Sequence, residues 1–251
     1  NQIKSLKIQN GNISFRSVYC LFFTNNDSVL WVGTSGHGLI KLNIEKQHGE
    51  YRVKDFKQFR ATSQKGSLNN DIIFSITQGR TNNELLIGTR GGGVSRLNLI
   101  TNNFELIKNA YHINLSNNDI LCMLNRNNNL YIGTSSGLNY LQQTTSGNIN
   151  YKLYTETEGL LNSTIHGILT DKNNDVWVST NNGISHIQTD NVVNYTHKDG
   201  LQSNEFSDGA FYSDSKGIMY FGGVNGFNYF VPTDIFSRLQ TFASLERSQN
   251  I

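Results

Sequence analysis

The sequence is poor in proline, cysteine and charge. Its 251 residues include 1 Pro and 2 Cys, and only 16% are charged, with 21 Lys and Arg against 19 Asp and Glu. A formal net charge of +2 makes a strong phosphate-binding surface unfavourable, so we predict no nucleic-acid partner. No apolar run approaches the roughly 20 residues of a membrane helix, and no signal-like leader is visible. Because the first residue is Asn, we interpret the chain as a mature segment or a fragment.

The two cysteines indicate neither a compartment nor a metal site. Cys20 and Cys122 lie in apolar runs far apart in the sequence, and we expect two small buried side chains. A metal site needs more ligands than these two, and the 6 histidines show no ligand spacing. We therefore predict no metal and no cofactor.

Asparagine and glycine are abundant, at 35 and 23 residues. Both accept the positive φ of tight turns. Aromatic residues make up 11% of the chain, which argues against disorder. This composition predicts many short strands joined by tight turns.

An internal repeat organises the chain. Each copy has an apolar pair followed by Gly or Ser and then by Thr or Gly, and a second apolar run begins a few residues later at a glycine. The first residues of successive copies are 55, 45, 46 and 43 positions apart. The five copies of the first motif are Trp31–Thr34, Leu86–Thr89, Tyr131–Thr134, Trp177–Thr180 and Tyr220–Gly223.

Every copy but the last contains four apolar runs separated by polar turns. Alternation over about four to eight residues, bounded by Asn, Gly and Ser, predicts strands. Four-stranded units of about 40 to 50 residues are typical of propeller blades. We predict an all-β fold, a β-propeller of about five four-stranded antiparallel blades within residues 1–232. The repeats are expected near residues 17–59, 70–107, 118–154, 163–196 and 204–230.

The ring in the first motif is expected to fill the gap between neighbouring blades. A single small sheet has two apolar faces and cannot bury either one alone, so stacked blades bury both. We expect this packing role for Trp31, Tyr131, Trp177 and Tyr220 in preference to ligand stacking. The glycine that follows allows a close approach of the backbone.

The last copy lacks a fourth run. Residues 233–251 show no matching alternation, and we expect a C-terminal tail with a short amphipathic helix. The N-terminal run Ile3–Ile8 either supplies the missing strand of a closed five-bladed ring or forms an outer strand of an earlier blade. In the second case, which we favour, the chain is part of a larger, seven-bladed propeller.

The run from Asn162 to Ser185, with Asp-Val-Trp-Val-Ser-Thr-Asn-Asn-Gly at its centre, resembles the two-component regulator propeller repeat. The run Tyr195–Asn204 also resembles that repeat, and Gly222–Pro232 is similar to the family's closing blade. The resemblance covers roughly residues 1–232. It implies the periplasmic sensor region of a hybrid two-component histidine kinase of Bacteroidetes, whose role is to sense glycan breakdown products.

The same resemblance implies partners and a location. The expected partner is an oligosaccharide or another small ligand, and the parent sensor, anchored in the inner membrane, would associate as a dimer. Family members continue past the final proline into an Ig-like domain, whereas Asp234–Ile251 does not show that pattern. We therefore expect a truncated or incomplete chain, with no membrane segment and no kinase in this part.

Blade topology suggests a ligand-binding face. The loop that enters the first strand and the loop between strands two and three open on the same side of a blade. Amide and charged side chains there match the fixed donors and acceptors that sugar hydroxyls need, although an Asn before a strand usually caps a turn. The candidate ligand-binding residues are His37, Arg90, His166, Asn182, Asn204 and Glu205.

We expect no catalysis in this segment, because no phosphate-binding loop, His-Glu-x-x-His or Gly-x-Ser-x-Gly motif occurs. Two alternatives to a sensor stay open. One is a protein-interaction propeller, although Trp-Asp and kelch signatures are missing. The other is a propeller lyase, which would use His166 and His186 as acid-base groups.

Overall fold

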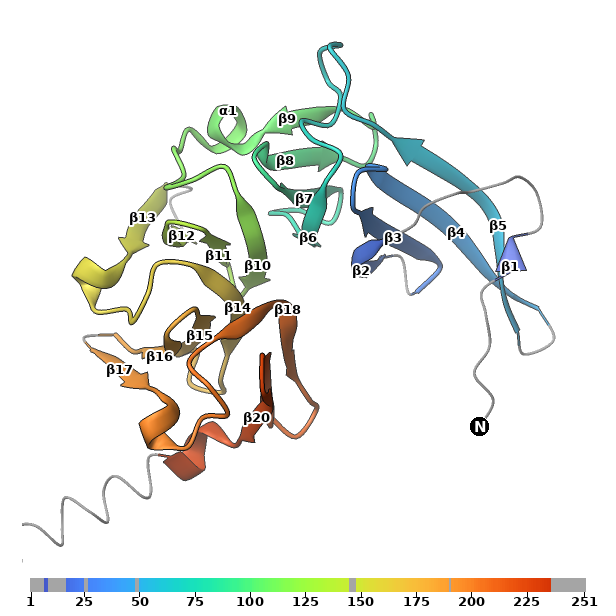
Figure 1. Cartoon of the computed structure of the whole chain (residues 1–251). Coiled ribbons are helices and arrows are strands. Elements are labelled where there is room, and N and C mark those ends of the chain that lie inside the picture. The colour runs from blue at the N-terminus through green and yellow to red at the C-terminus, as the bar shows by residue number, and fades with distance from the viewer. Residues whose placement is uncertain are drawn as a thin grey trace, which may run out of the picture. The chain divides into compact units, whose positions relative to one another are not determined.

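The computed structural model describes residues 7–8, 17–24, 27–47, 50–144, 148–189 and 191–235. The chain divides into two compact units, Asn1–Leu153 and Tyr154–Ile251. Five sheets make up almost all of the regular structure (Figure 1), and apart from one short parallel pair their strands are antiparallel. The prediction of an all-β fold is confirmed.

The first unit contains three sheets. Their strand orders are β1-β5-β4-β3-β2, β6-β7-β8-β9 and β10-β11-β12-β13, so consecutive strands lie side by side except for β1, which pairs with β5. The elements are β1 (Lys7–Ile8), β2 (Val18–Thr24), β3 (Val29–Thr34), β4 (Leu39–Gln47), β5 (Glu50–Phe59), β6 (Ile73–Gln78), β7 (Glu84–Thr89), β8 (Gly93–Asn98), β9 (Phe104–Leu106), α1 (Ile107–Tyr111), β10 (Ile120–Arg126), β11 (Asn129–Thr134), β12 (Gly137–Gln143) and β13 (Ile149–Tyr154).

The second unit contains two sheets. One has the order β14-β15-β16-β17, and the other has three strands among the described residues, in the order β18-β19-β20. Two short 3₁₀ turns, Glu156–Glu158 and His197–Asp199, precede the first strands of these sheets. The strands are β14 (Ile165–Thr170), β15 (Val176–Thr180), β16 (Gly183–Ile187), β17 (Val192–Tyr195), β18 (Phe206–Ser213), β19 (Met219–Gly223) and β20 (Gly226–Phe230).

The two ends of the chain differ in part from the expectation. Lys7 and Ile8 pair in parallel with Arg52 and Val53 of β5, at the outer edge of the first sheet. The described part of the N-terminal run therefore adds a fifth strand to the first blade and does not complete the last one. At the other end, residues 232–235 are helical, and residues 236–251 of the expected tail lie outside the described residues. In the part of the chain that the structure describes, no helix has the length and apolar character needed to cross a membrane.

The core lies between neighbouring sheets, as the blade interpretation requires. In the first unit Trp31 is 1% exposed and packs in a cluster with Ile73 and Leu85 of the next sheet. In the second unit Trp177 is fully buried in a cluster with Phe206 and Phe221. The packing role of these two rings is confirmed.

The rings of the third and fifth copies have different surroundings. Tyr131 is buried and stacks on Tyr140 of its own sheet. Tyr220, in contrast, is half-buried, and its ring contacts are with Tyr212, Phe227 and Tyr229 of its own sheet. The Tyr220 ring, in the last described sheet, is therefore less buried than the rings of Trp31, Tyr131 and Trp177.

The glycine of the first motif lies where the next sheet comes closest. A Cβ on Gly88 would stand 2.6 Å from Cγ2 of Ile120 and 3.1 Å from Cε of Met123. Ile120 is fully buried and cannot yield. We therefore expect Gly88→Ala to lower the free energy of unfolding by about 1–3 kcal/mol through overpacking, measured by urea denaturation.

The matched control is Gly222→Ala, at the same place in the last copy. Its new Cβ would first meet Cβ of Ala210 at 3.0 Å, on the half-buried neighbouring strand. The loss should be smaller than for Gly88→Ala. Equal losses would show that close approach between sheets does not fix the residue at position 88.

Candidate ligand-binding site

The β15–β16 turn presents two asparagines in a fixed conformation. Thr180 ends β15, and its Oγ1 donates to the carbonyl of Gly183 at 3.0 Å and accepts from the backbone N–H of Asn182 at 3.0 Å. The backbone φ of Gly183 is 118°, a value that residues other than glycine rarely adopt. The turn is held from within, and Asn181 and Asn182, both exposed, lie at its tip.

The β17–β18 connection is held by a capping box. Thr196 Oγ1 accepts from the N–H of Lys198 at 3.3 Å, and the Asp199 carboxylate accepts from the N–H of Thr196 at 2.8 Å. Gly200 then ends the 3₁₀ turn with φ of 98°. This connection carries His197 and the residues that follow it to the same place as the β15–β16 turn.

The β15–β16 turn, the β17–β18 connection and the β19–β20 turn together line a polar pocket that is open to solvent and has a volume of about 510 Å³. Asn204 Nδ2 donates to Asn182 Oδ1 at 3.2 Å, and Asn204 Oδ1 accepts from the N–H of His197 at 2.8 Å. Gln202 Oε1 accepts from the N–H of Asn225 at 2.7 Å. These bonds fix the side-chain amides before any ligand arrives. The polar pocket is lined by Asn181, Asn182, His197, Gln202, Ser203, Asn204, Glu205 and Asn225.

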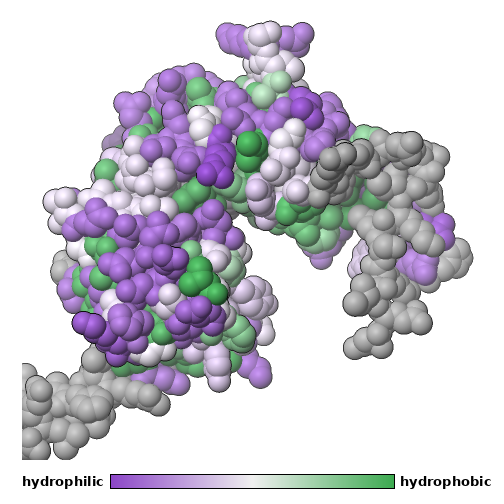
Figure 2. Space-filling view, viewed as in Figure 1, coloured by the Kyte–Doolittle hydropathy of each residue, from purple (hydrophilic) through white to green (hydrophobic). Residues whose placement is uncertain are grey.

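The lining combines many neutral donors and acceptors with little charge. Only His197 and Glu205 carry ionisable side chains among its residues. Figure 2 shows that the surface of the second unit facing the viewer is mostly hydrophilic, with a few hydrophobic side chains between. Such a lining can hydrogen-bond a polyhydroxylated ligand without demanding that the ligand be charged.

Three of the sequence-based candidates, Asn182, Asn204 and Glu205, line this pocket. His166 reaches it indirectly, because its ring nitrogen Nε2 lies 2.7 Å from Oδ1 of Asn181. Sequence reasoning did not single out His197, although the Thr-x-x-Asp spacing of the capping box around it was available as a signal.

The other two candidates lie in the first unit, each with its own contacts. The N–H of His37 donates to Thr34 Oγ1 at 3.1 Å, and its carbonyl accepts from Gln58 at 2.8 Å. Nε of Arg90 lies 3.8 Å from Oδ1 of Asp119, and its guanidinium lies 5.5 Å from the centre of the Phe74 ring. Neither residue lines the polar pocket.

His166 is 9% exposed and is held at both ring nitrogens. Its Nδ1 lies 2.5 Å from Oδ1 of Asp208 on β18, and its Nε2 contacts Asn181. Burial works to lower the pKa of His166, but the hydrogen bonds to Asp208 and Asn181 and the charge of Asp208 outweigh it, so the pKa is raised above 6.5. The protonated ring is therefore the favoured form in the folded protein up to a pH above that value.

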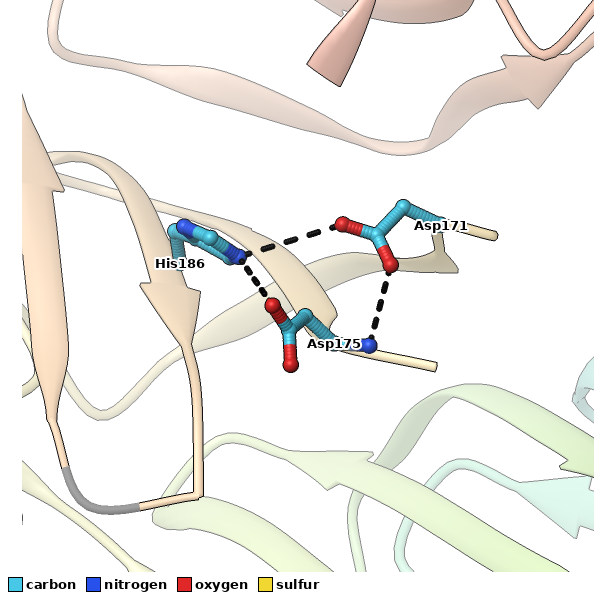
Figure 3. A group of neighbouring side chains, drawn as sticks. All are labelled: Asp171, Asp175 and His186. Carbon is cyan, nitrogen blue, oxygen red and sulfur yellow. Dashed lines mark hydrogen bonds and ion pairs between the residues drawn. The ribbon is translucent and has the colours of Figure 1, made fainter. Parts of the chain in front are cut away.

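A second set of titratable side chains, the His186 cluster, consists of Asp171 and Asp175 in the β14–β15 turn and His186 on β16 (Figure 3). Nε2 of His186 lies 3.3 Å from Oδ2 of Asp175 and 4.0 Å from Oδ2 of Asp171. The His186 ring is fully buried and stacks on Trp177, with 3.9 Å between ring centres. Burial lowers the pKa of His186 and outweighs the two carboxylates, which act to raise it.

The ligand atoms of the His186 cluster lie within 4.8 Å of one another, a spacing that could hold a metal ion. Both carboxylate oxygens of Asp171, however, already accept hydrogen bonds within the protein. Its Oδ1 accepts from the N–H groups of Asn173 and Asp175, and its Oδ2 accepts from Trp177 Nε1 at 3.2 Å. This bonding favours a role in shaping the β14–β15 turn and seating the Trp177 ring. A His186 ring covered by Trp177 is also badly placed to act as an acid or base on a substrate.

A second cavity, of about 440 Å³, lies beside β20. Its walls include the rings of Trp177, Tyr195, Tyr229 and Phe230, and its boundary reaches Ile235, the last described residue. It lies at the outer side of β20, where the other sheets have a fourth strand. We attribute this cavity to sheet architecture and not to ligand binding.

Comparison with solved structures defines the class of fold. The extracellular domain of the putative hybrid two component system BT3049 from B. thetaiotaomicron has 26% identity and a TM-score of 0.71, over 88% of this chain and 28% of that one. Virginiamycin B lyase from Staphylococcus aureus has 14% identity and a TM-score of 0.52, over 85% of this chain and 69% of that one, which shows a shared fold alone. The chain has the β-propeller fold, as predicted.

The resemblance to a particular repeat family is also confirmed. Residues 159–182 match the model of the two component regulator propeller. The chain is 28% identical over 229 residues to histidine kinase P4 of Formosa agariphila, which covers 86% of this chain and 16% of that protein. This chain therefore spans less than a third of the histidine kinase and of the BT3049 domain that it matches.

Proposed function

We propose that this chain is a ligand-binding propeller segment of the extracytoplasmic sensor region of a hybrid two-component histidine kinase. Its similarity to the extracellular domain of BT3049 and to a histidine kinase supports the assignment. On this proposal the segment is periplasmic and non-catalytic, and it passes ligand occupancy to a kinase elsewhere in the parent protein. Self-association of the parent as a dimer belongs to the same proposal.

The ligand that we propose for the polar pocket is an oligosaccharide. The observation that carries this proposal is the row of amides fixed by mutual hydrogen bonds, with Asn204 bonded to both Asn182 and His197. Sugar hydroxyls both donate and accept, so pre-oriented amides can bind them with little loss of side-chain entropy. Of the residues predicted from the sequence, Asn182, Asn204 and Glu205 take this role directly, and His166 takes it through Asn181.

The test is thermal denaturation of the chain with a panel of oligosaccharides, followed by calorimetric titration with any sugar that stabilises it. A ligand at a hundredfold excess over its dissociation constant stabilises the folded state by about 2.7 kcal/mol. Asn204→Ala should weaken binding roughly tenfold, because it removes one ligand partner and releases Asn182 and the N–H of His197.

The matched control is Asn191→Ala, which changes an exposed asparagine of the same unit that does not line the polar pocket. Its affinity should equal that of the unaltered chain. If no sugar stabilises the protein, or if the two variants lose the same affinity, the polar pocket is not the binding site. Chromatography of the sugar after long incubation tests the non-catalytic assignment, since any new product would indicate an enzyme.

A further inference from the structure

We propose that His166 acts as a specificity-determining residue, because its protonation decides whether Asn181 offers the polar pocket a hydrogen-bond donor or an acceptor. The proposal rests on the proposed function of the polar pocket, and it concerns which ligand groups the pocket accepts at a given pH. The three side chains involved come from β14, the β15–β16 turn and β18 of the second unit.

The observed geometry corresponds to the charged ring. Nδ1 faces a carboxylate oxygen of Asp208 at 2.5 Å, and Nε2 faces the amide oxygen of Asn181 at 2.7 Å. Both neighbouring atoms are acceptors in this arrangement, so a ring that carries a proton on each nitrogen satisfies both contacts. With its oxygen turned inward to His166, the exposed amide of Asn181 turns its NH₂ group, a pure donor, toward the pocket that this residue lines.

Loss of the proton reverses this arrangement. A carboxylate only accepts, so the remaining ring proton stays on Nδ1 beside Asp208, and Nε2 becomes an acceptor once its proton passes to solvent. Two acceptors, Nε2 and the Asn181 oxygen, would then face each other at hydrogen-bond distance in a partly buried place. A half-turn of the Asn181 amide removes that conflict, because Nδ2 then donates to Nε2. The oxygen, a pure acceptor, now faces the polar pocket.

Few other charged side chains lie on the strands around His166 to affect its protonation. The strands that pack around His166 in its unit are β14, β15 and β18, and their single other charged side chain is Asp208. Glu205, in the loop before β18, and His197 line the polar pocket. The raised pKa of His166 places the change of state above pH 6.5, within the range in which histidine titration can act as a switch.

The consequence is a difference between ligand classes. A hydroxyl can donate or accept, so a neutral sugar tolerates either state of Asn181. A carboxylate only accepts, so a uronic-acid sugar fits the NH₂ state and meets a second acceptor in the other state. Affinity for a uronate oligosaccharide should therefore fall roughly tenfold as His166 loses its proton, whereas affinity for the neutral counterpart should change little.

The first experiment needs no ligand. In the full chain, nitrogen NMR of His166 and of the Asn181 side-chain amide is followed from pH 5.5 to 8.5. We expect both signals to change with one shared midpoint above pH 6.5, with the neutral ring protonated at Nδ1. Asp208→Asn should lower the midpoint, and His166→Gln should make the Asn181 signal independent of pH, while the Asn182 amide serves as an internal control. An Asn181 signal that does not follow His166, or a neutral ring protonated at Nε2, would overturn the proposal.

The second experiment uses trigalacturonate and galactotriose as probes across the same pH range. The proposal predicts a pH-dependent affinity for the first probe that follows the His166 midpoint and disappears in His166→Gln. Affinity for trigalacturonate that stays constant through that midpoint would contradict it. If neither probe binds while the NMR signals follow each other, the switch stands, and the assigned ligand of the polar pocket is wrong.

Discussion

Trp177→Ala is expected to lower the free energy of unfolding by about 3–5 kcal/mol, the range for removing a large aromatic side chain from a packed core. The ring is fully buried among Phe206, Phe221 and other apolar side chains of two neighbouring sheets. The variant also loses the bond from Nε1 to Asp171 and the stack on His186. At about 2–4 °C for each kcal/mol, thermal denaturation should show a drop of roughly 6–20 °C.

Tyr220→Ala is the matched control for this change, because Tyr220 has the same place in the fifth copy of the repeat. Its ring is half-buried and contacts rings of its own sheet, Tyr212 and Tyr229 among them. The expected loss is about 1 kcal/mol. A loss as large as that of Trp177→Ala would mean that burial between sheets is not what makes the Trp177 ring important. Trp177→Phe, which keeps a ring but no N–H, provides a milder variant if the alanine variant fails to fold.

Asp171→Asn should lower the free energy of unfolding by about 1–3 kcal/mol, because it leaves one buried donor unsatisfied. The amide oxygen can still accept from the N–H groups of Asn173 and Asp175, as Oδ1 does now. The new NH₂ group then faces Trp177 Nε1, so two donors meet where a carboxylate oxygen accepted before. Denaturation by urea gives the loss, and the fluorescence of Trp177 should change in the folded state.

Asp214→Asn is the matched control, because it changes the same kind of turn carboxylate without breaking a bond like that from Trp177 Nε1 to Asp171. Asp214 organises the corresponding turn of the next sheet, where its Oδ1 accepts from the N–H groups of Lys216 and Ile218. The residue six positions after it is Tyr220, which has no indole N–H. We therefore expect a change within about 0.5 kcal/mol. If the two variants are equally unstable, turn geometry and not the Trp177 bond accounts for the role of Asp171.

The blade pattern could be predicted because its causes are local. Alternating side chains, Asn-rich turns and a glycine after the apolar pair lie within a few residues of one another. The burial of Trp31 and Trp177 followed from the need of each sheet to cover its apolar faces. The same argument predicted burial of Tyr220, which is only half-buried, because local spacing does not say whether another sheet packs against a given copy.

The polar pocket could be predicted only in part. Asn182, Asn204 and Glu205 were found from the side of the blade on which their loops open, and they lie together. His37 and Arg90 were selected by the same rule but have other partners in the first unit. Blade topology predicts the side of the blade on which a loop opens, whereas a pocket forms only where particular loops come together.

The sequence by itself determined the kind of unit from which this protein is built, since strand period and turn chemistry are properties of neighbouring residues. Only the tertiary structure decided that His166 lies between Asp208 and Asn181, and that Lys7 and Ile8 run beside β5. These pairings join residues far apart in the chain. Their energies depend on distance and orientation in space, and the local sequence pattern predicts neither.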